Sequence, residues 1–120
     1  MLIDDSEITL AMEKSVLEAR GYQVRATSTL IEFEKTLEDW KPDLILTDIH
    51  MPEVKGTDIC RTLKSGYGTQ DIPIILFSSL PDKELAILAE QVGADGYLSK
   101  INGLNALGEK IDELVESIIW

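Results

Sequence analysis

From position 44 the chain reads Leu44-Ile45-Leu46-Thr47-Asp48-Ile49-His50-Met51-Pro52, an apolar run that ends in a carboxylate and then turns. Such a run is typical of a buried strand, and its polar end places Asp48 at the strand tip. Ligands and chemistry collect at strand tips in open α/β sheets. Two more carboxylates, Asp4 and Asp5, follow a second apolar start at residues 1–3. Three acids from two strand ends can converge on one point, and a cluster of this kind attracts a cation.

The bulk composition limits the class of protein. The 120 residues contain 22 acidic and 11 basic side chains, a formal net charge of −11, and the length predicts one domain with a single core. This balance argues against a nucleic-acid partner, because phosphate binding needs clustered Lys and Arg. The single cysteine, Cys60, excludes an internal disulfide and fits a reducing compartment. No stretch has membrane-spanning length and no signal-peptide pattern is present, so we expect a soluble cytoplasmic domain without membrane contact.

Along the first half of the chain, short apolar runs alternate with amphipathic helical patterns. Strands are expected over residues 1–3 and 22–26, and a third ends at Asp48. The helix after the first strand should end at Gly21, which is placed where a C′ glycine would be. The apolar residues at helical spacing are Ile8, Met12 and Val16 in the first helix and Leu30, Phe33 and Leu37 in the second.

The second half continues this alternation. Helices are expected over residues 57–64 and after Pro81, with Gly93 ending the latter, and strands over 72–77 and 96–99. The inner stripe of the helix after Pro81 is Leu85, Leu88, Ala89 and Val92, its outer face is Lys83, Ala86, Ile87 and Glu90, and the last helix carries Leu104, Leu107, Ile111, Leu114 and Ile118. A strand followed by a helix thus recurs five times, with connections that fit right-handed parallel crossovers. The pattern predicts an α/β fold, a parallel sheet with helices on both faces.

All the candidate chemistry lies at the carboxyl ends of these strands. In chain order the residues are Asp4 and Asp5 after the first strand, Asp48 at the end of the third, Ser78 at the end of the fourth and Lys100 after the fifth. Three close carboxylates either raise one pKa or recruit a divalent cation, and Mg²⁺ suits oxygen ligands and bridges to phosphate. A hydroxyl and an ammonium beside them can hold the other oxygens of a phosphoryl group. The set predicts phosphoryl transfer to a carboxylate nucleophile.

Several separated motifs are similar to those of bacterial two-component response-regulator receiver domains, which resemble chemotaxis regulators and have a flavodoxin-like fold. The motifs are Asp4-Asp5, Asp48 with Pro52 four residues on and Gly56 eight on, Ser78, and the segment Gly93-Ala94-Asp95-Gly96-Tyr97-Leu98-Ser99-Lys100. They are spread over nearly the whole chain. The resemblance implies a single receiver domain over residues 1–120, with a doubly wound sheet of five parallel strands in the order 2-1-3-4-5.

The resemblance also implies roles for the acidic residues. Asp48 would accept a phosphoryl group from a phosphohistidine in the presence of Mg²⁺. Asp5 and Asp48 would coordinate the Mg²⁺, with the backbone carbonyl of His50 as a further ligand. Asp4 would act indirectly, through water or by orienting its neighbours.

By the same resemblance, Ser78 and Lys100 would hold phosphoryl oxygens, and Tyr97 would turn inward as an aromatic switch. The chain would be a signalling domain rather than an enzyme, although it would promote its own phosphoryl transfer and autodephosphorylation. Its donor would be a sensor histidine kinase or a phosphotransfer protein of a phosphorelay. Its output would be a downstream protein or an attached effector domain, and a homodimer through the fourth helix, fifth strand and fifth helix is an open option.

Simpler interpretations exist for the same residues. An Asp after a strand is often a turn former or a helix cap, and Asp5 fits the second description. Ser79 competes with Ser78, and a strand tyrosine such as Tyr97 can pack without switching. A lone histidine near a site, here His50, is usually incidental.

Two rival functions follow from these interpretations. The first is a pseudo-receiver that binds proteins independently of phosphorylation. The second is an aspartyl-phosphate phosphatase. Enzymes resembling the haloacid-dehalogenase family have a second acid two residues after the nucleophile, whereas this chain has His50 there. A flavin-binding domain would want a hydroxyl- and glycine-rich loop after the first strand, and this chain has acids there.

Three features depart from the family pattern. Ile101 follows Lys100 where the family usually has proline, often with a cis bond, so the loop that carries Lys100 is expected to take another path. The first strand has only residues 1–3 before its acids. The chain ends in Ile118-Ile119-Trp120, an apolar finish that fits equally a domain cut from a longer protein and a self-association surface.

Overall fold

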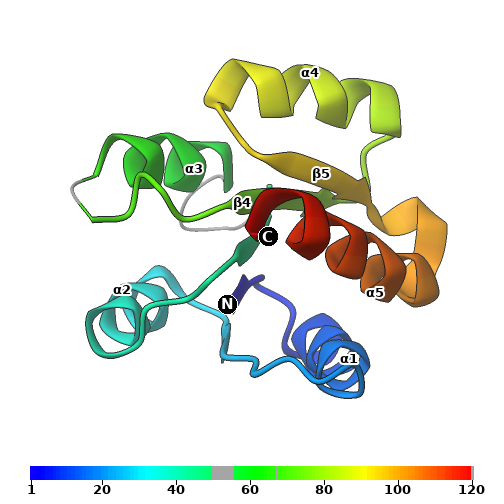
Figure 1. Ribbon diagram of the computed structural model, residues 1–120, viewed down its shortest axis with the longest axis horizontal. Coiled ribbons are helices and arrows are strands. Elements are labelled where there is room, and N and C mark those ends of the chain that lie inside the picture. Colours follow the sequence, from blue (N-terminus) through cyan, green and yellow to red (C-terminus); the bar gives the residue numbers. More distant parts are fainter. Residues whose placement is uncertain (50–55, 67, 120) are drawn as a thin grey trace.

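The computed structural model describes residues 1–49, 56–66 and 68–119, and this part of the chain forms one parallel sheet with helices packed on it (Figure 1). The sheet has five strands in the order β2-β1-β3-β4-β5, and each neighbouring pair is parallel. The strands are β1 (Leu2–Ile3), β2 (Ala26–Thr27), β3 (Ile45–Asp48), β4 (Ile74–Ser78) and β5 (Gly96–Ser99). The predicted α/β fold and strand order are therefore confirmed.

The helices alternate with the strands along the chain. They are α1 (Glu7–Glu18), α2 (Leu30–Asp39), α3 (Gly56–Ser65), α4 (Asp82–Val92), the 3-10 helix η1 (Lys100–Asn102), α5 (Gly103–Leu114) and the π-helix η2 (Val115–Ile119). Within the described ranges, none of them has both the length and the apolar character needed to cross a membrane.

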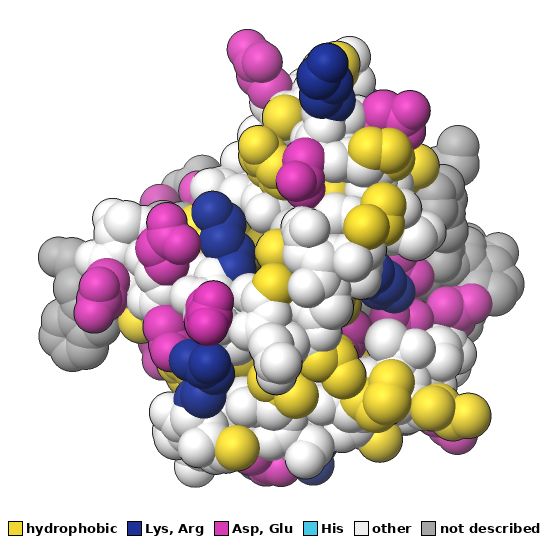
Figure 2. All heavy atoms as spheres, turned by 90° about the vertical axis from the view of Figure 1, so that its right-hand side faces the viewer, with side chains coloured by type: hydrophobic (Ala, Val, Ile, Leu, Met, Phe, Trp, Pro, Cys, Tyr) yellow, Lys and Arg dark blue, Asp and Glu magenta, His cyan; other side chains and the backbone are white. Residues whose placement is uncertain are grey.

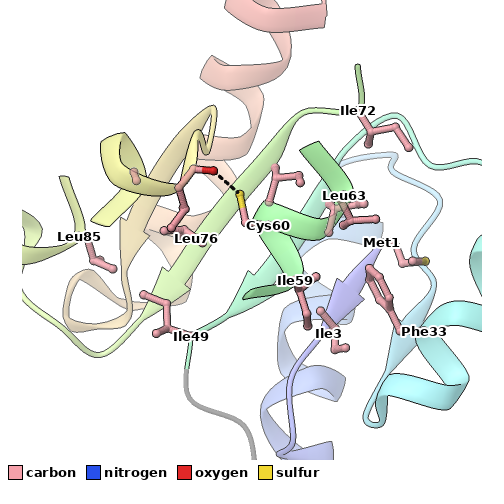
Figure 3. Packing of buried hydrophobic residues seen from close by; sticks show 14 residues of the cluster. Met1, Ile3, Phe33, Ile49, Ile59, Cys60, Leu63, Ile72, Leu76 and Leu85 are labelled. Atoms are coloured by element: carbon pink, nitrogen blue, oxygen red, sulfur yellow. Dashed lines mark hydrogen bonds between the residues drawn. The ribbon is translucent and has the colours of Figure 1, made fainter. Parts of the chain in front are cut away.

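The core has two parts, one on each face of the sheet. Successive strand residues point to opposite faces, so Ile74 and Leu76 of β4 join one cluster while Ile75 and Phe77 join the other. The first cluster packs under α2, α3 and α4 (Figure 3) and includes Phe33, Ile59, Leu63 and Leu85. The second packs under α1 and α5 and includes Leu10, Leu17, Leu107 and Ile111. Burial on both faces explains why β4 is apolar at consecutive positions.

Local sequence signals set the ends of several helices. The Thr29 hydroxyl caps α2 by accepting the N–H of Glu32 at 3.2 Å. Gly21 has φ 94°, and the N–H of Tyr22 donates to the carbonyl of Leu17, which closes the turn after α1 as a Schellman motif does. Gly93 ends α4 with φ 77°, so both glycine-based predictions are confirmed.

The prediction for the buried face of α1 is wrong. Ile8 and Met12 are 76% and 46% exposed, whereas Leu10, Glu13 and Leu17 are buried. Both sets recur at helical spacing, and hydrophobicity alone favoured the wrong one because a glutamate occupies the true inner stripe. Figure 2 shows hydrophobic side chains along the lower edge of the molecule, on the side where α1 lies in Figure 1.

The second strand is displaced from its predicted range of 22–26. It pairs with β1 only at Ala26 and Thr27, because each of these residues faces one of the two residues of β1. β4 is also shifted, to Ile74–Ser78 from the predicted 72–77, although Ile72 is still buried. β5 has the predicted bounds.

Helices α1 and α5 are joined by a polar contact just beyond the end of α1. Arg20 forms an ion pair with Asp112 of α5, and the hydroxyl of Tyr22 donates to the same carboxylate at 2.6 Å. The arginine side chain lies over Gly108, where an added Cβ would come within 2.2 Å of its Nε. The absence of a side chain at position 108 is therefore what makes room for Arg20.

Candidate functional site

The carboxyl ends of β1 and β3 bring three aspartates together. One carboxylate oxygen from each of Asp4, Asp5 and Asp48 lies within 4.8 Å of the others. Asp4 and Asp48 are buried, at 2% and 8% exposure, and Asp5 is exposed. The strands are adjacent and parallel, so their ends meet at one edge of the sheet, as the sequence predicts.

Asp48 is held at its base by the main chain. Its Oδ1 accepts the N–H of Ile49 at 2.8 Å and lies 3.7 Å from the ammonium of Lys100. These contacts orient the carboxylate at the tip of β3. A carboxylate fixed in this way beside a cation is suited to act as a nucleophile toward an anionic group.

Asp4 is the closest partner of Lys100. Its Oδ2 accepts from the ammonium at 2.9 Å, and its Oδ1 accepts the N–H of Ser6 at 3.0 Å. The Ser6 hydroxyl in turn caps α1 by accepting the N–H of Thr9. The side chain that caps α1 is therefore Ser6, and the alternative role of Asp5 as the cap is not borne out by the structure.

Lys100 reaches the acids although Ile101 follows it. The peptide bond between the two residues is trans, and η1 begins at Lys100. Burial works against the charged form of Lys100, but the hydrogen bond to Asp4 and the charge of Asp48 outweigh it and raise its pKa. The ammonium also lies 5.4 Å from the centre of the Phe77 ring, a cation–π distance.

Ser78 and Tyr97 occupy neighbouring strands beside this cluster. Ser78 is buried at the end of β4 and its hydroxyl accepts the N–H of Leu80 at 3.3 Å, whereas Ser79 is exposed. Tyr97 is half-buried in β5 and packs against the core cluster under α4. Of the two serines, Ser78 is the one that points from a strand end into the interior.

Four residues named from the sequence lie outside the described residues. They are His50, whose carbonyl is expected to be a metal ligand, Met51, Pro52, and Trp120 of the apolar end of the chain.

Sequence reasoning missed Glu13, a fourth carboxyl group near the cluster. It is 2% exposed, and its Oε1 has no hydrogen-bond partner among the described residues. Burial, and then the negative charge of Asp4, raise its pKa to about 8, while Lys100 acts in the opposite direction. The signal was present, because Glu13 stands between Leu10 and Leu17 at helical spacing, and a charged residue in an apolar stripe marks an unusual environment.

The residues present fit a divalent cation with oxygen ligands. Asp4, Asp5 and Asp48 supply three carboxylates, and the orphaned oxygen of Glu13 adds a buried acceptor near them. A buried polar atom without a partner calls for an explanation, and an ion or its water is one. Mg²⁺ takes one or two carboxylates and keeps several waters, which matches a cluster with one solvent-exposed member.

The chain is similar to known proteins over most of its length. A family model described as "Response regulator receiver domain" matches residues 1–112. The "Gliding motility regulatory protein" of Myxococcus xanthus is 36% identical over 115 residues, which are 95% of this chain and 15% of that protein. The "Polar-differentiation response regulator DivK" of Brucella anthropi is 31% identical over 100 residues, which are 83% of this chain and 81% of that protein. This chain therefore spans a small part of the first relative and most of the second.

A solved structure gives the same picture of the fold. The signal receiver domain of a signal transduction histidine kinase from Syntrophus aciditrophicus has a TM-score of 0.83 and 31% sequence identity. The match covers 98% of this chain and 89% of that one.

Proposed function

The chain belongs to the response regulator receiver domain family, and from this premise we propose that Asp48 accepts a phosphoryl group and thereby switches the domain. The observation that carries the proposal is the convergence of Asp4, Asp5 and Asp48 with the ammonium of Lys100 at one edge of the sheet. The phosphoryl donor is a phosphohistidine of a sensor kinase or phosphotransfer protein. Its N–P bond breaks, an O–P bond to Asp48 forms, and the histidine leaves as imidazole.

Mg²⁺ is the proposed cofactor. Asp5, Asp48 and the carbonyl of His50 are its proposed ligands, with Asp4 acting indirectly, and when bound it offsets the negative charge that gathers during the transfer. Lys100 is already shared between Asp4 and Asp48, so a new phosphoryl oxygen can compete for it without a large movement. The same residues support slow hydrolysis of the acyl phosphate, which returns the domain to its resting state.

The switch rests on Ser78 and Tyr97. Phosphorylation replaces one carboxylate charge by a dianionic group, and Ser78 and Lys100 can each bond its oxygens. Moving a mostly inactive population to a mostly active one takes about 3 to 5 kcal/mol, which two or three charge-assisted contacts can supply. Tyr97 packs beside α4, so an inward turn of its ring changes the surface that α4 and β5 present.

The output surface is proposed to be α4, β5 and α5, where a downstream protein, an attached effector domain or a second copy of the chain would bind. Ile87 supports it, because this large apolar side chain is 58% exposed on the outer face of α4. We also propose that residues 1–120 act as one receiver domain in the cytoplasm, which the single unpaired Cys60 supports.

The proposal is tested by incubating the protein with acetyl phosphate and Mg²⁺ and measuring the intact mass. We expect a phosphoryl adduct that is labile to base, is absent from Asp48→Asn, and does not form when the Mg²⁺ is chelated. Asp58→Asn is the matched control, because it changes an exposed aspartate of α3. This variant should still be phosphorylated on Asp48 as wild type is.

Equal adduct formation in wild type and Asp48→Asn would contradict the proposal. A wild-type protein that forms no adduct with this donor or with a phosphohistidine donor would favour the pseudo-receiver instead.

A further inference from the structure

One buried hydroxyl connects the two loops that carry Ser78 and Lys100. Ser99 ends β5, is 1% exposed, and donates to the carbonyl of Leu80 at 2.7 Å. The same hydroxyl accepts the N–H of Ile101 at 3.2 Å. Leu80 completes the chain of contacts, because its own N–H donates to the hydroxyl of Ser78 at 3.3 Å. Ser78 and Ser99 are also direct neighbours in the β4–β5 register.

The contact from Ile101 depends on the residue type at that position. Proline, which similar receivers usually have there, has no N–H and could not donate to Ser99. The side chain of Ile101 is 68% exposed, so the residue is tied to the site by its main chain rather than by packing. The loop that begins at Lys100 is therefore held by a hydrogen bond that a proline at position 101 could not form.

We propose that Ser99 is a positioning residue that couples the loop of Ser78 to the loop of Lys100, an inference that rests on the proposed phosphoryl transfer. Both loops must present a group to the same phosphoryl oxygens, and a donor–acceptor hydroxyl between them fixes one relative to the other. Lys100 can lie 2.9 Å from Asp4 and 3.7 Å from Asp48 only while η1 keeps its place. Through Ser99, a movement of the loop that carries Ser78 is therefore transmitted to the loop that carries Lys100.

Four variants separate the parts of this coupling. Ser99→Ala removes both contacts, Ile101→Pro removes the donor and also restricts the backbone of Lys100, and Ser99→Thr keeps the hydroxyl. Thr69→Ala is the matched control, because Thr69 donates to the carbonyl of Leu63 at 2.8 Å in the loop before β4, at the other end of that strand.

The first measurement is made on the unphosphorylated protein by NMR of the backbone amides. We expect Ser99→Ala to remove the exchange protection of the Ile101 amide and Ile101→Pro to shift the Leu80 amide. Among the described residues, the hydrogen bonds that join residues 80 and 101 run through Ser99. In the Ser99→Ala background, Ile101→Pro should produce no further shift at Leu80. A Leu80 amide that is indifferent to Ile101→Pro in the wild-type background would overturn the coupling.

The second measurement is the rate of adduct formation with acetyl phosphate and Mg²⁺. We expect Ser99→Ala to react about three- to tenfold more slowly, the factor that corresponds to one net hydrogen bond, and Ser99→Thr and Thr69→Ala to stay near the wild-type rate. A wild-type rate in Ser99→Ala, with Asp48→Asn inactive, would refute the positioning role and leave the proposed function intact. If wild type forms no adduct with acetyl phosphate or with a phosphohistidine donor, the proposed function fails, and the amide shifts alone decide whether Ser99 couples the loops.

Discussion

At the scale of single residues, Lys100 and the acidic side chains around it set the charge of the site. Lys100 is bonded to Asp4 and close to Asp48, and the two acids together outweigh its burial and raise its pKa. One ammonium facing three aspartates leaves an excess of negative charge. Burial raises the pKa of Glu13 to about 8, and the negative charge of Asp4 acts in the same direction.

Glu13 should make the stability of the metal-free protein depend on pH. The group is protonated in the folded state and ionised in the unfolded state between its ordinary pKa of 4.5 and about 8. The Met1 amino group, whose pKa burial lowers to about 5, binds fewer protons in the folded state over the same window. The Glu13 contribution to the free energy of unfolding has the opposite sign and falls as the pH rises through the window. A shift of this size corresponds to a loss on the order of 5 kcal/mol. Urea denaturation in the presence of a chelator, from pH 5 to pH 8, measures it.

Glu13→Gln is the variant that isolates this effect, because it keeps the shape of the protonated acid and cannot ionise. We expect the free energy of unfolding of wild type to decrease relative to that of the variant as the pH rises from 5 to 8, because the Met1 contribution is common to both proteins and cancels in the difference. Parallel curves would show that Glu13 is ionised at neutral pH in the folded protein.

The sequence predicted which side chains converge better than it predicted their environments. The convergence of Asp4, Asp5, Asp48 and Lys100 was predicted because the ends of parallel strands meet at one edge of a sheet. The partner that Lys100 prefers could not be found this way, because it depends on differences of about an ångström between side chains. Glu13 was missed because a glutamate within a helix is normally assigned to the solvent.

At the scale of elements, α4 has a face that packs on the core and a face that is exposed to solvent. Leu85 is fully buried under the helix, whereas Ile87 is 58% exposed on the opposite face. Both are large apolar residues on the same element, so only their direction distinguishes them. The inner stripe was predicted from helical spacing, and burial of Leu85, Ala89 and Val92 confirms it.

We expect Ile87→Glu to leave the free energy of unfolding within about 0.5 kcal/mol of wild type, while Leu85→Ala costs about 2 to 5 kcal/mol. Sedimentation velocity then tests the proposed output surface. Wild type loaded with Mg²⁺ and beryllofluoride, a phosphoryl analogue, should self-associate, and Ile87→Glu should stay monomeric. Monomers in both samples would remove self-association through this face and leave a different protein as its partner.

Elements differed in how well the sequence predicted them. Helices with a clear end signal, such as Gly93 after α4, ended where expected. β2 did not begin where expected, because the extent of a strand depends on its partner, and β1 pairs with it at two residues. Pairing between segments far apart in the sequence is not visible in a local pattern.

At the scale of the whole molecule, the net charge of −11 means that a bound cation should change the free energy of unfolding of the protein. A cation that binds only the folded state raises the free energy of unfolding by about 2.7 kcal/mol at a hundredfold excess over its dissociation constant. We expect Mg²⁺ to raise the thermal midpoint, measured by circular dichroism, more than NaCl at equal ionic strength does. Asp5→Asn should shrink this increment.

Asp58→Asn serves as the control for charge, since it removes one exposed carboxylate that is not one of the three in the cluster. Equal Mg²⁺ increments in wild type, Asp5→Asn and Asp58→Asn would mean that Mg²⁺ acts by general screening.

The contact of Arg20 with Gly108 has a consequence for how this protein can evolve. A side chain at position 108 would push the end of the Arg20 side chain aside, and Asp112 would then lose its ion pair while keeping the hydrogen bond from Tyr22. A substitution at one of the two positions therefore changes the space or the contact available to the other. In an alignment of descendants of this sequence, residues 20 and 108 should covary, although they are 88 positions apart in the sequence.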